Sequence, residues 1–580
     1  MESIISSLQG AISYAVPMIV LLGLLIFVHE LGHFLVAKYF KVRVEVFSLG
    51  FGPKLFKFKR GDTVYAISAI PLGGYVKMFG DDPTAEIPAD QKRFSFTSKP
   101  VGQRIAVVLA GPIMNLFFAI VLFSGVASLG EQALAPKIGD VEPQSDAFQA
   151  GFRSGDSVIS VGGEKIRTWD EFQHVVEANA DHTLSIAIQH ADVAAQETPP
   201  ETLQVMPKLA ANKTVLSWDR QVGEVDGLNY VSRAAVIGIR DPNSLAAKAG
   251  LKTGDIIQSV NGEKLTKWRD LAGVLKKYAP TGTLNFEVER GILDDKDGQK
   301  EGAVGTTEKI ALTLPAAEDS PDLLQRLGIE FPELYLASLE KHSPAESAGL
   351  KKGDRLLSID NKPVQSFEQV ASIIRSFGQS SQSKATTGES KVQPLAVTVL
   401  RDGKEVAVSV APNIKERMSA QGREEKHFEI GIRPLIIDAT PATIDLAYSN
   451  PIDVVKRGFS QTIKWTSLTV LSFVRLFQNE VSPKNIGGFL SIGQMAKRSW
   501  AIGPSQFLNV MAIISINLFI LNLLPVPVLD GGHLVFYTFE AVRGAPLSMR
   551  KMEIAQQVGL FLLLGLMVFA LFNDFSRLFS

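Results

Sequence analysis

Residues 14–37 read YAVPMIVLLGLLIFVHELGHFLVA, an apolar run that contains two histidines and a glutamate near its end. About 20 apolar residues are enough to cross a bilayer as a helix, so this stretch predicts a transmembrane helix. A cleaved signal peptide is the alternative, but no Lys or Arg precedes Lys38 and no small-residue cleavage site follows the run. We therefore expect a membrane protein whose first helix carries ionisable side chains.

Three further apolar runs, at about 104–130, 505–524 and 556–576, predict three more transmembrane helices. The segment 38–103 contains eleven Lys and Arg residues, whereas the residues before it contain none. Because positively charged loops remain in the cytoplasm, 38–103 is expected inside and the N-terminus outside. Four crossings then place the long segment 131–500 and the C-terminus outside.

Composition agrees with a mixture of membrane and soluble parts. The 580 residues are 46% hydrophobic and 21% charged, with a mean hydropathy of +0.14. The 59 Lys and Arg residues balance 60 Asp and Glu residues, so no basic field for nucleic acid is expected. Cysteine is absent from the sequence, which leaves His, Asp and Glu as ligands for any transition metal.

The histidines of the first apolar run have the spacing of a metal site. On a helix, His29 and His33 are separated by about 40° around the axis and about 6 Å along it. Two imidazoles on one face can share a zinc ion, and Glu30 between them would stand near the metal-bound water. Because ionisable groups are costly at membrane depth, we interpret this group as functional.

A third ligand is not supplied by the usual soluble patterns. A metzincin would need Gly and His where this chain has Val36 and Tyr39, and a gluzincin glutamate is missing downstream. A second polar cluster, NLLPVPVLDGGH at 522–533, follows the third apolar run. Its prolines stop the helix, and irregular backbone at this depth indicates a site around Asp530.

The long exterior segment contains a threefold repeat. The copies AGFRSGD, AGLKTGD and AGLKKGD occupy 150–156, 249–255 and 348–354, each 99 residues after the last. An alternating strand, a helix and two further strands are expected after each copy. The pattern resembles the PDZ domain of bacterial proteases, which binds extended peptides and often captures a terminal carboxylate. The alternative is a spacer array that keeps bulky proteins away from the membrane.

The pairing of HExGH at 29–33 with NxxPxPxLDGG at 522–532 resembles the site-2 protease family of intramembrane zinc metalloproteases. Gly111, Pro112 and Asn115 resemble a packing motif of that family, and residues 42–79 resemble its membrane-associated β-hairpin. The stretch ALFNDF at 570–575 resembles the bacterial regulator-of-sigma-E branch. Three PDZ-like copies, where that branch has two, are the departure.

The resemblance implies roles for particular residues. His29, His33 and Asp530 would bind Zn2+, and Glu30 would act as general base and then as proton donor to the leaving amine. Asn522 would hold the substrate backbone, although an amide that only packs between helices is the alternative. The alternation at 42–47 and 63–67 predicts strands that pair with the unwound substrate.

For that pairing we expect Val64 and Ala66 to be substrate-binding positions. Proline at either position should then lower turnover without changing the zinc content, because proline removes a backbone donor.

The predicted fold is a multi-pass α-helical membrane protein with four transmembrane helices, three inserted PDZ-like α+β domains and a membrane-associated β-hairpin region. The expected segments are a first helix at 1–37, the hairpin loop at 38–103, a second helix at 104–130, PDZ-like domains at 131–213, 230–315 and 325–413, a linker with an amphipathic surface helix at 414–500, a third helix with the LDG loop at 501–530, and a loop with a fourth helix at 531–580.

The function implied by the resemblance is intramembrane zinc endopeptidase activity on transmembrane segments of single-span proteins, in regulated intramembrane proteolysis. Anti-sigma factors or signal peptide remnants are the implied substrates, with peptide C-termini as further partners at the PDZ-like domains. The implied location is the bacterial inner membrane, with termini and PDZ-like domains in the periplasm and the active site toward the cytoplasm. A scaffold with a vestigial site and a metal transporter are the alternatives.

Overall fold

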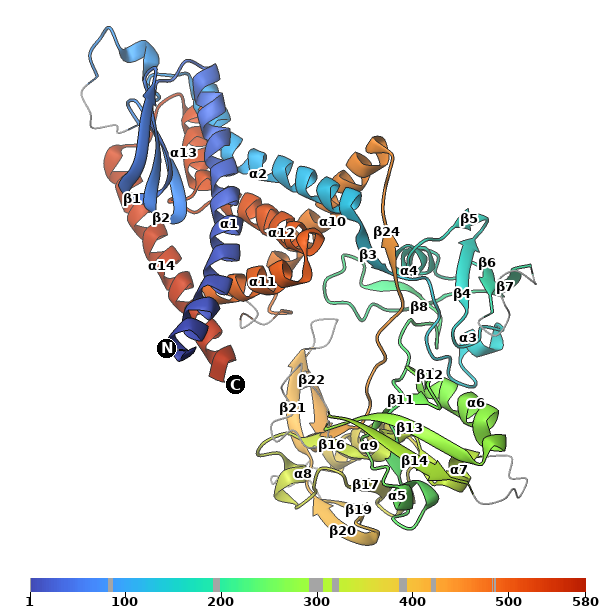
Figure 1. The fold of residues 1–580 in the computed structure, drawn as a ribbon. Helices are drawn as coiled ribbons and strands as arrows, with labels where there is room; N and C mark the ends of the chain where they lie inside the picture. The colour runs from blue at the N-terminus through green and yellow to red at the C-terminus, as the bar shows by residue number, and fades with distance from the viewer. Residues whose placement is uncertain are drawn as a thin grey trace. The chain divides into compact units, whose positions relative to one another are not determined.

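The structure is a computed structural model and describes residues 2–81, 87–190, 199–291, 306–314, 323–384, 394–418, 424–481, 483 and 487–579. The chain forms two compact units, each with its own core (Figure 1). The first, here called the membrane unit, comprises Met1–Gln132, Thr214–Trp218 and Asp445–Ser580. The second, the repeat unit, comprises Ala133–Lys213 and Asp219–Ile444.

Four long apolar helices form the frame of the membrane unit: α1 Glu2–Tyr39, α2 Val101–Leu129, α12 Pro504–Leu523 and α14 Met549–Phe579. Within the described residues, these are the helices long and apolar enough to cross a bilayer, which confirms the four predicted spans to within a few residues. The helices α1 and α12 pack against α2. Burial of apolar side chains such as Leu25, Phe123 and Ile516 holds the three together.

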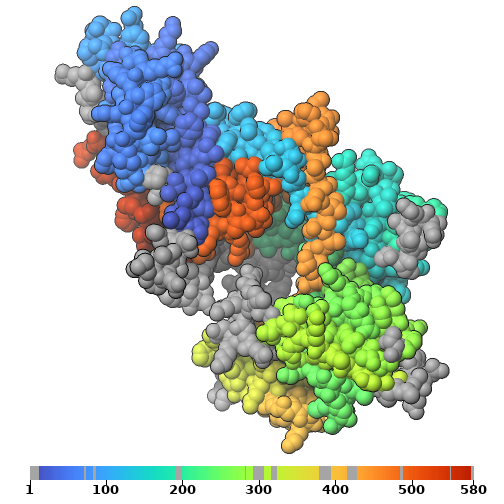
Figure 2. Space-filling model, viewed as in Figure 1, coloured from blue at the N-terminus to red at the C-terminus, as the bar shows by residue number. Residues whose placement is uncertain are grey.

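The predicted hairpin is present as two long strands beside α1, β1 Val44–Arg60 and β2 Thr63–Met78 (Figure 1). In the space-filling view, the hairpin forms the lighter blue surface next to the darker blue of α1 (Figure 2). Both strands bend, so their paired residues form a sheet of four segments. The segments 54–60 and 74–78 are the two outer ones of this sheet. Val64 has backbone partners on both sides, Val46 and Lys59.

Ala66 likewise lies between Ser48 and Lys57. The expectation that Val64 and Ala66 pair with substrate is therefore wrong, because strand addition requires an unpaired edge.

Three further α-helices belong to the membrane unit: α10 Pro451–Phe477, α11 Phe489–Ile502 and α13 Asp530–Arg543. The helix predicted at 452–477 is present as α10, which packs on α2 and α12. Gly458 lies against Ser124 of α2, and Thr469 Oγ1 donates a hydrogen bond to Asn517 Oδ1 of α12 at 3.1 Å. The face of α10 that was expected to meet lipid headgroups is thus partly used for packing within the protein.

The repeat unit contains three copies of one plan: a short helix, a four-stranded sheet and a longer helix that covers it. The strand orders are β5-β4-β6-β7, β12-β11-β13-β14 and β18-β17-β19-β20. The elements of the first copy are α3 Asp146–Gln149, β4 Ser157–Val161, β5 Glu164–Lys165, α4 Trp169–Ala178, β6 Leu184–Gln189 and β7 Glu201–Val205. Those of the second are α5 Leu245–Ala249, β11 Ile256–Val260, β12 Glu263–Lys264, α6 Trp268–Tyr278, β13 Thr283–Arg290 and β14 Thr306–Thr313. Those of the third are α8 Pro344–Ser347, β17 Arg355–Ile359, β18 Lys362–Pro363, α9 Phe367–Lys384, β19 Leu395–Arg401 and β20 Lys404–Val410.

Each copy is longer than the sequence analysis predicted. Val225, Leu327 and Ile430 belong to the three cores, although the predicted domains end at 213, 315 and 413. Each copy also has elements outside the common plan of helices and four-stranded sheet. They are β8 Lys208–Ala211 and β9 Gln221–Glu224 in the first copy, β10 Gly238–Ile239, α7 Leu323–Leu327 and β15 Ile329–Glu330 in the second, and β16 Leu336–Leu339, β21 Asn413–Met418, β22 Glu424–Glu429 and β23 Ile432–Pro434 in the third. The strands β3 Glu131–Leu134 and β24 Thr443–Leu446 lie near the ends of the repeat unit's sequence.

In each copy, a glycine allows the last segment of the chain to pack against the start of the short helix and close the core. Gly227, Gly328 and Gly431 have positive φ, and a Cβ there would lie within 2.5 Å of the serine that begins the short helix of the same copy. That serine accepts a backbone N–H three residues later in every copy, as an N-cap. The final segment can reach the cap only without a side chain.

The aspartates of the repeated Gly-Asp pairs are buried: Asp156, Asp255 and Asp354. Each accepts a backbone N–H from three residues earlier, at 2.8–2.9 Å, which closes the turn. Each also binds a basic side chain at the end of the third strand of its sheet, and these partners are His190, Arg290 and Arg401. A buried charge needs such a partner, so the repeated aspartate is structural.

Candidate metal centre in the membrane unit

His29 and His33 lie on one face of α1, as the four-residue spacing requires, with their Nε2 atoms 3.2 Å apart. Asp530, the first residue of α13, approaches the same point. Its Oδ2 is 3.2 Å from His29 Nε2 and 3.6 Å from His33 Nε2. These three residues form the group of potential metal ligands found within the described part of the chain, and one donor atom of each lies within 4.8 Å of the others.

The position of Asp530 follows from the break between α12 and α13. The helix α12 ends at Leu523, and Pro525 and Pro527 prevent its continuation because proline has no N–H and fixes φ. A tight turn follows in which Leu529 N–H donates to Val526 O at 2.9 Å. The turn redirects the chain, so Asp530 faces α1 rather than continuing along α12.

Contacts from α2 orient the two imidazoles. His33 Nδ1 is 2.9 Å from the Val107 carbonyl, so this nitrogen carries the proton and the Nε2 lone pair faces Asp530. The amide of Asn115 lies 3.4 Å from His29 Nδ1. With its amide nitrogen facing His29, Asn115 has a buried Oδ1 that lacks a hydrogen-bond partner among the described residues.

Rotation of the Asn115 amide by half a turn resolves this conflict, because the two orientations occupy the same space. Oδ1 would then accept the Nδ1 proton of His29, which satisfies the buried oxygen and leaves the Nε2 lone pair directed at Asp530. Gly111 provides the space for both rings, since a Cβ there would lie 2.2 Å from His33 Nε2.

The donor set fits zinc. Two imidazole nitrogens with accessible lone pairs and one carboxylate oxygen are a usual zinc set for a catalytic centre with an open fourth position. A histidine that binds a metal through Nε2 normally donates its Nδ1 proton to a hydrogen-bond acceptor, as His33 does here. The residues therefore match the metal that the sequence predicted, although the assignment of individual ligands remains a prediction.

Glu30 faces the hairpin. Its carboxylate lies close to the Val76 backbone N–H, and its Cγ lies 3.3 Å from the position of a Cβ on Gly74. The outer segment 74–78 of β2 therefore runs beside the predicted general base. Asn522 is half-buried near the end of α12, one residue before the helix stops.

A second polar contact between α2 and α13 was not predicted. Arg104 forms a two-pronged ion pair with Glu540, at 2.5 and 3.1 Å, and its guanidinium lies over the ring of Tyr537. Since α13 begins with Asp530, this pair fixes the helix that carries the third candidate ligand. An arginine close to the start of an apolar span was the available signal in the sequence.

Comparison with known proteins gives a consistent result. The model of peptidase family M50 matches residues 17–566. A Neisseria meningitidis protein named as a zinc metalloprotease is 30% identical over 96% of this chain and 97% of its own length. The regulator of sigma-E protease of Salmonella typhimurium is 29% identical over 97% of this chain and 98% of its own. A solved PDZ domain protein from Parabacteroides distasonis aligns with 51% of this chain and 95% of its own, at 13% identity and a TM-score of 0.13, which is too low to assign a fold.

Proposed function

Because this chain belongs to peptidase family M50 and is a zinc metalloendopeptidase, we propose that it cleaves transmembrane segments of single-span membrane proteins, with His29, His33 and Asp530 as zinc ligands. The observation that carries this proposal is the convergence of α1 and α13 on one point between membrane-spanning helices. A peptidase site placed there is suited to substrates that lie in the bilayer.

The side chains around this point divide the work of hydrolysis. Zinc bound there supplies Lewis acidity, which polarises the scissile carbonyl and acidifies the attacking water. Glu30 takes a proton from that water as the oxygen attacks the carbonyl carbon. It then returns the proton to the amide nitrogen as the C–N bond breaks, so it ends the cycle ionised.

The substrate must be unwound, because a helix hides its peptide bonds behind backbone hydrogen bonds. The outer segment 74–78 of β2 takes the place of Val64 and Ala66 in this role. It is paired with β1 on one side and lies beside Glu30 on the other, so an extended substrate could be added as a strand next to the base. Asn522, from α12, would hold the substrate backbone on the opposite side of the cut bond.

The substrates we propose are anti-sigma factors or signal peptide remnants in the bacterial inner membrane. Support comes from the regulator of sigma-E protease that the chain resembles over nearly its full length. For the orientation, we propose that the hairpin and the active site face the cytoplasm and that the termini and the repeat unit lie in the periplasm. The charge asymmetry of the loops supports this, because loops rich in Lys and Arg remain in the cytoplasm.

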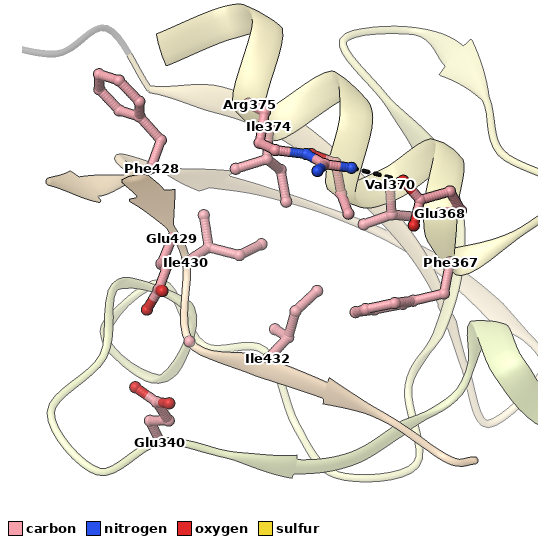
Figure 3. A pocket seen from close by; sticks show the side chains of 12 residues that line it. Glu340, Phe367, Glu368, Val370, Ile374, Arg375, Phe428, Glu429, Ile430 and Ile432 are labelled. Atoms are coloured by element: carbon pink, nitrogen blue, oxygen red, sulfur yellow. Dashed lines mark hydrogen bonds and ion pairs between the residues drawn. The ribbon is translucent and has the colours of Figure 1, made fainter. Parts of the chain in front are cut away.

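The third repeat offers a groove for peptide C-termini. A cavity of about 410 Å³ lies between α9 and the segment 428–432, which joins β22 to β23. Apolar side chains of both line it, with Phe367, Val370 and Ile374 on the helix and Phe428, Ile430 and Ile432 on the segment (Figure 3). An extended peptide laid along this segment would bury apolar side chains against α9.

In the other two repeats, the segment that precedes the glycine at the N-cap serine packs against the longer helix. In the first, β9 lies so close to α4 that a Cβ on Gly223 would be 2.4 Å from the Val176 carbonyl. In the second, Leu323 and Leu324 of α7 pack on the core beside α6. We therefore assign peptide binding to the third repeat. Ala371→Arg, in the groove, should abolish binding of a labelled peptide C-terminus, whereas Ser372→Arg, exposed on the same helix, should not.

Cleavage of a labelled single-span substrate by the purified protein tests the main proposal. Glu30→Gln should lower the rate by about 10²- to 10⁴-fold, the usual contribution of a general base, with zinc retained. Glu553→Gln, the same change at an exposed position of α14, should cleave like the wild type. Unchanged cleavage by Glu30→Gln would refute the assignment of the base.

A further inference from the structure

A second cavity, of about 330 Å³, lies between α1 and the hairpin of the membrane unit. One face of α1 forms its first wall, and residues from both β1 and β2 form the other. The lining residues are Ile19, Val20, Gly23, Leu24 and Phe27 on α1, and Leu49, Gly50, Ile67, Ser68 and Gly73 on the hairpin.

The cavity is suited to an apolar occupant. Among its lining residues, Ser68 is the one with a polar side chain, and it is almost completely buried. Its hydroxyl is already hydrogen-bonded to Ser48 Oγ at 3.0 Å, and Ser48 in turn lies 3.3 Å from the Gly50 carbonyl. The hydroxyl proton of Ser68 is therefore not available to a polar ligand, whereas a hydrocarbon group would gain burial.

The cavity adjoins the proposed substrate path. Gly73, in its wall, immediately precedes the outer segment 74–78 that runs beside Glu30. Gly23, on the opposite wall, precedes His29 by six residues, or about 9 Å along the helix. An extended chain covers that distance in about three residues.

We propose that this cavity is a specificity pocket for a bulky apolar side chain, such as Leu or Phe, two to four residues from the cut bond. The inference rests on the proposed function, because it takes the substrate to be extended along 74–78. A cavity of about 150 Å³ already holds a benzene ring, so this one accommodates a large aliphatic or aromatic side chain. A lipid acyl chain is the competing occupant.

A set of single-span substrates tests the pocket. Each carries one Leu or Phe, replaced by Ala, at a position two to four residues on either side of the cut bond. We expect one position at which the wild-type kcat/KM falls about tenfold or more on replacement, which is typical of a side chain lost from an apolar pocket. For the variant Gly23→Leu, the ratio of kcat/KM between the Leu or Phe substrate and its Ala counterpart should be near one. A Cβ at Gly23 meets no heavy atom within 4 Å, so the new side chain enters the cavity.

Gly565→Leu in α14 is the matched control, since its Cβ also meets no heavy atom within 4 Å and it lies outside the cavity. It should keep the wild-type ratio. Zinc content is measured for every variant, because a misfolded protein would lose its zinc. If Gly23→Leu is misfolded, the substrate series measured with the wild-type protein tests the pocket by itself. The inference is overturned if no position shows a preference, or if Gly23→Leu retains zinc and the full ratio. It is also overturned if Gly23→Leu changes only the amount of co-purified lipid. A wild-type protein that cuts none of the substrates would instead refute the proposed function.

Discussion

Asp530 in the membrane unit and Asp255 in the repeat unit are both largely buried carboxylates beside basic groups, but their partners differ in kind. Asp255 meets the guanidinium of Arg290 at 2.7 and 2.8 Å and the backbone N–H of Lys252 at 2.9 Å. The groups that face Asp530 are two imidazoles, whose outer nitrogens are held by α2.

The difference separates a structural pair from a metal site. Arginine is always protonated, so the Asp255 charge is balanced by the chain itself. A neutral imidazole presents a lone pair, and two of them beside a carboxylate form three donors without a cation. A metal ion bound at this point would balance the charge of Asp530, whereas Arg290 already balances that of Asp255.

The largest effect should appear when the structural pair is broken. Asp255→Ala leaves the partly buried Arg290 without its main partner and removes the buried carboxylate that closes the turn, so the second repeat should lose about 3 kcal/mol of unfolding free energy. Hydrogen exchange of the full-length protein measures this loss in residues 230–291. Asp270→Ala, at a half-exposed position on α6 of the same repeat, should change exchange little. Equal effects of the two changes on hydrogen exchange would contradict a structural role of Asp255. Both variants should keep the zinc content of the wild type.

The next effect concerns the support of His29. Asn115→Ala removes the acceptor for the His29 Nδ1 proton and should weaken zinc affinity by about 10- to 100-fold. Asn115→Asp keeps an acceptor oxygen and should bind zinc more tightly than the alanine variant. Competition with a metal chelator measures both affinities, and equal values would contradict the proposed orientation of the amide.

The smallest effect distinguishes the repeats from one another. Burial lowers the pKa of His190, but hydrogen bonds to Asp156 and Glu201 outweigh it and leave the pKa above its usual value. A raised pKa in the folded state means that His190 contributes stability below about pH 6.5, the usual value for histidine. This contribution is lost as the pH rises through the folded-state pKa.

Hydrogen exchange in the first repeat, relative to the second and third repeats with their arginines, should therefore accelerate as the pH rises through the folded-state pKa of His190. His190→Arg should remove the difference, and a first repeat that is equally stable at all these pH values would contradict it.

Much of the membrane unit could be predicted because simple physics dictates it. Bilayer thickness sets the length of an apolar run, so the four spans were found to within a few residues. Helix geometry places His29 and His33 on one face. The approach of Asp530, about 500 positions later in the chain, came from a resemblance to a family, because nothing local in the sequence encodes which helix it faces.

The errors arose where neighbours in space are set by the tertiary fold. Alternation of apolar residues reports which side chains share a face, but it does not report which strand lies beside another, so Val64 and Ala66 were placed on an edge. The final segments of the repeats, such as β15 and β23, contain two or three residues and are too short to show alternation. Their positions depend on the glycines that contact the N-cap serines.

Metal analysis of the purified wild-type protein and of Asp530→Ala, together with cleavage of a single-span substrate, tests the central claim most directly. We predict one zinc ion per wild-type chain, and loss of both zinc and hydrolysis when the Asp530 carboxylate is removed. A wild-type protein without zinc, or an Asp530→Ala protein that keeps its zinc and its hydrolysis, would contradict the account.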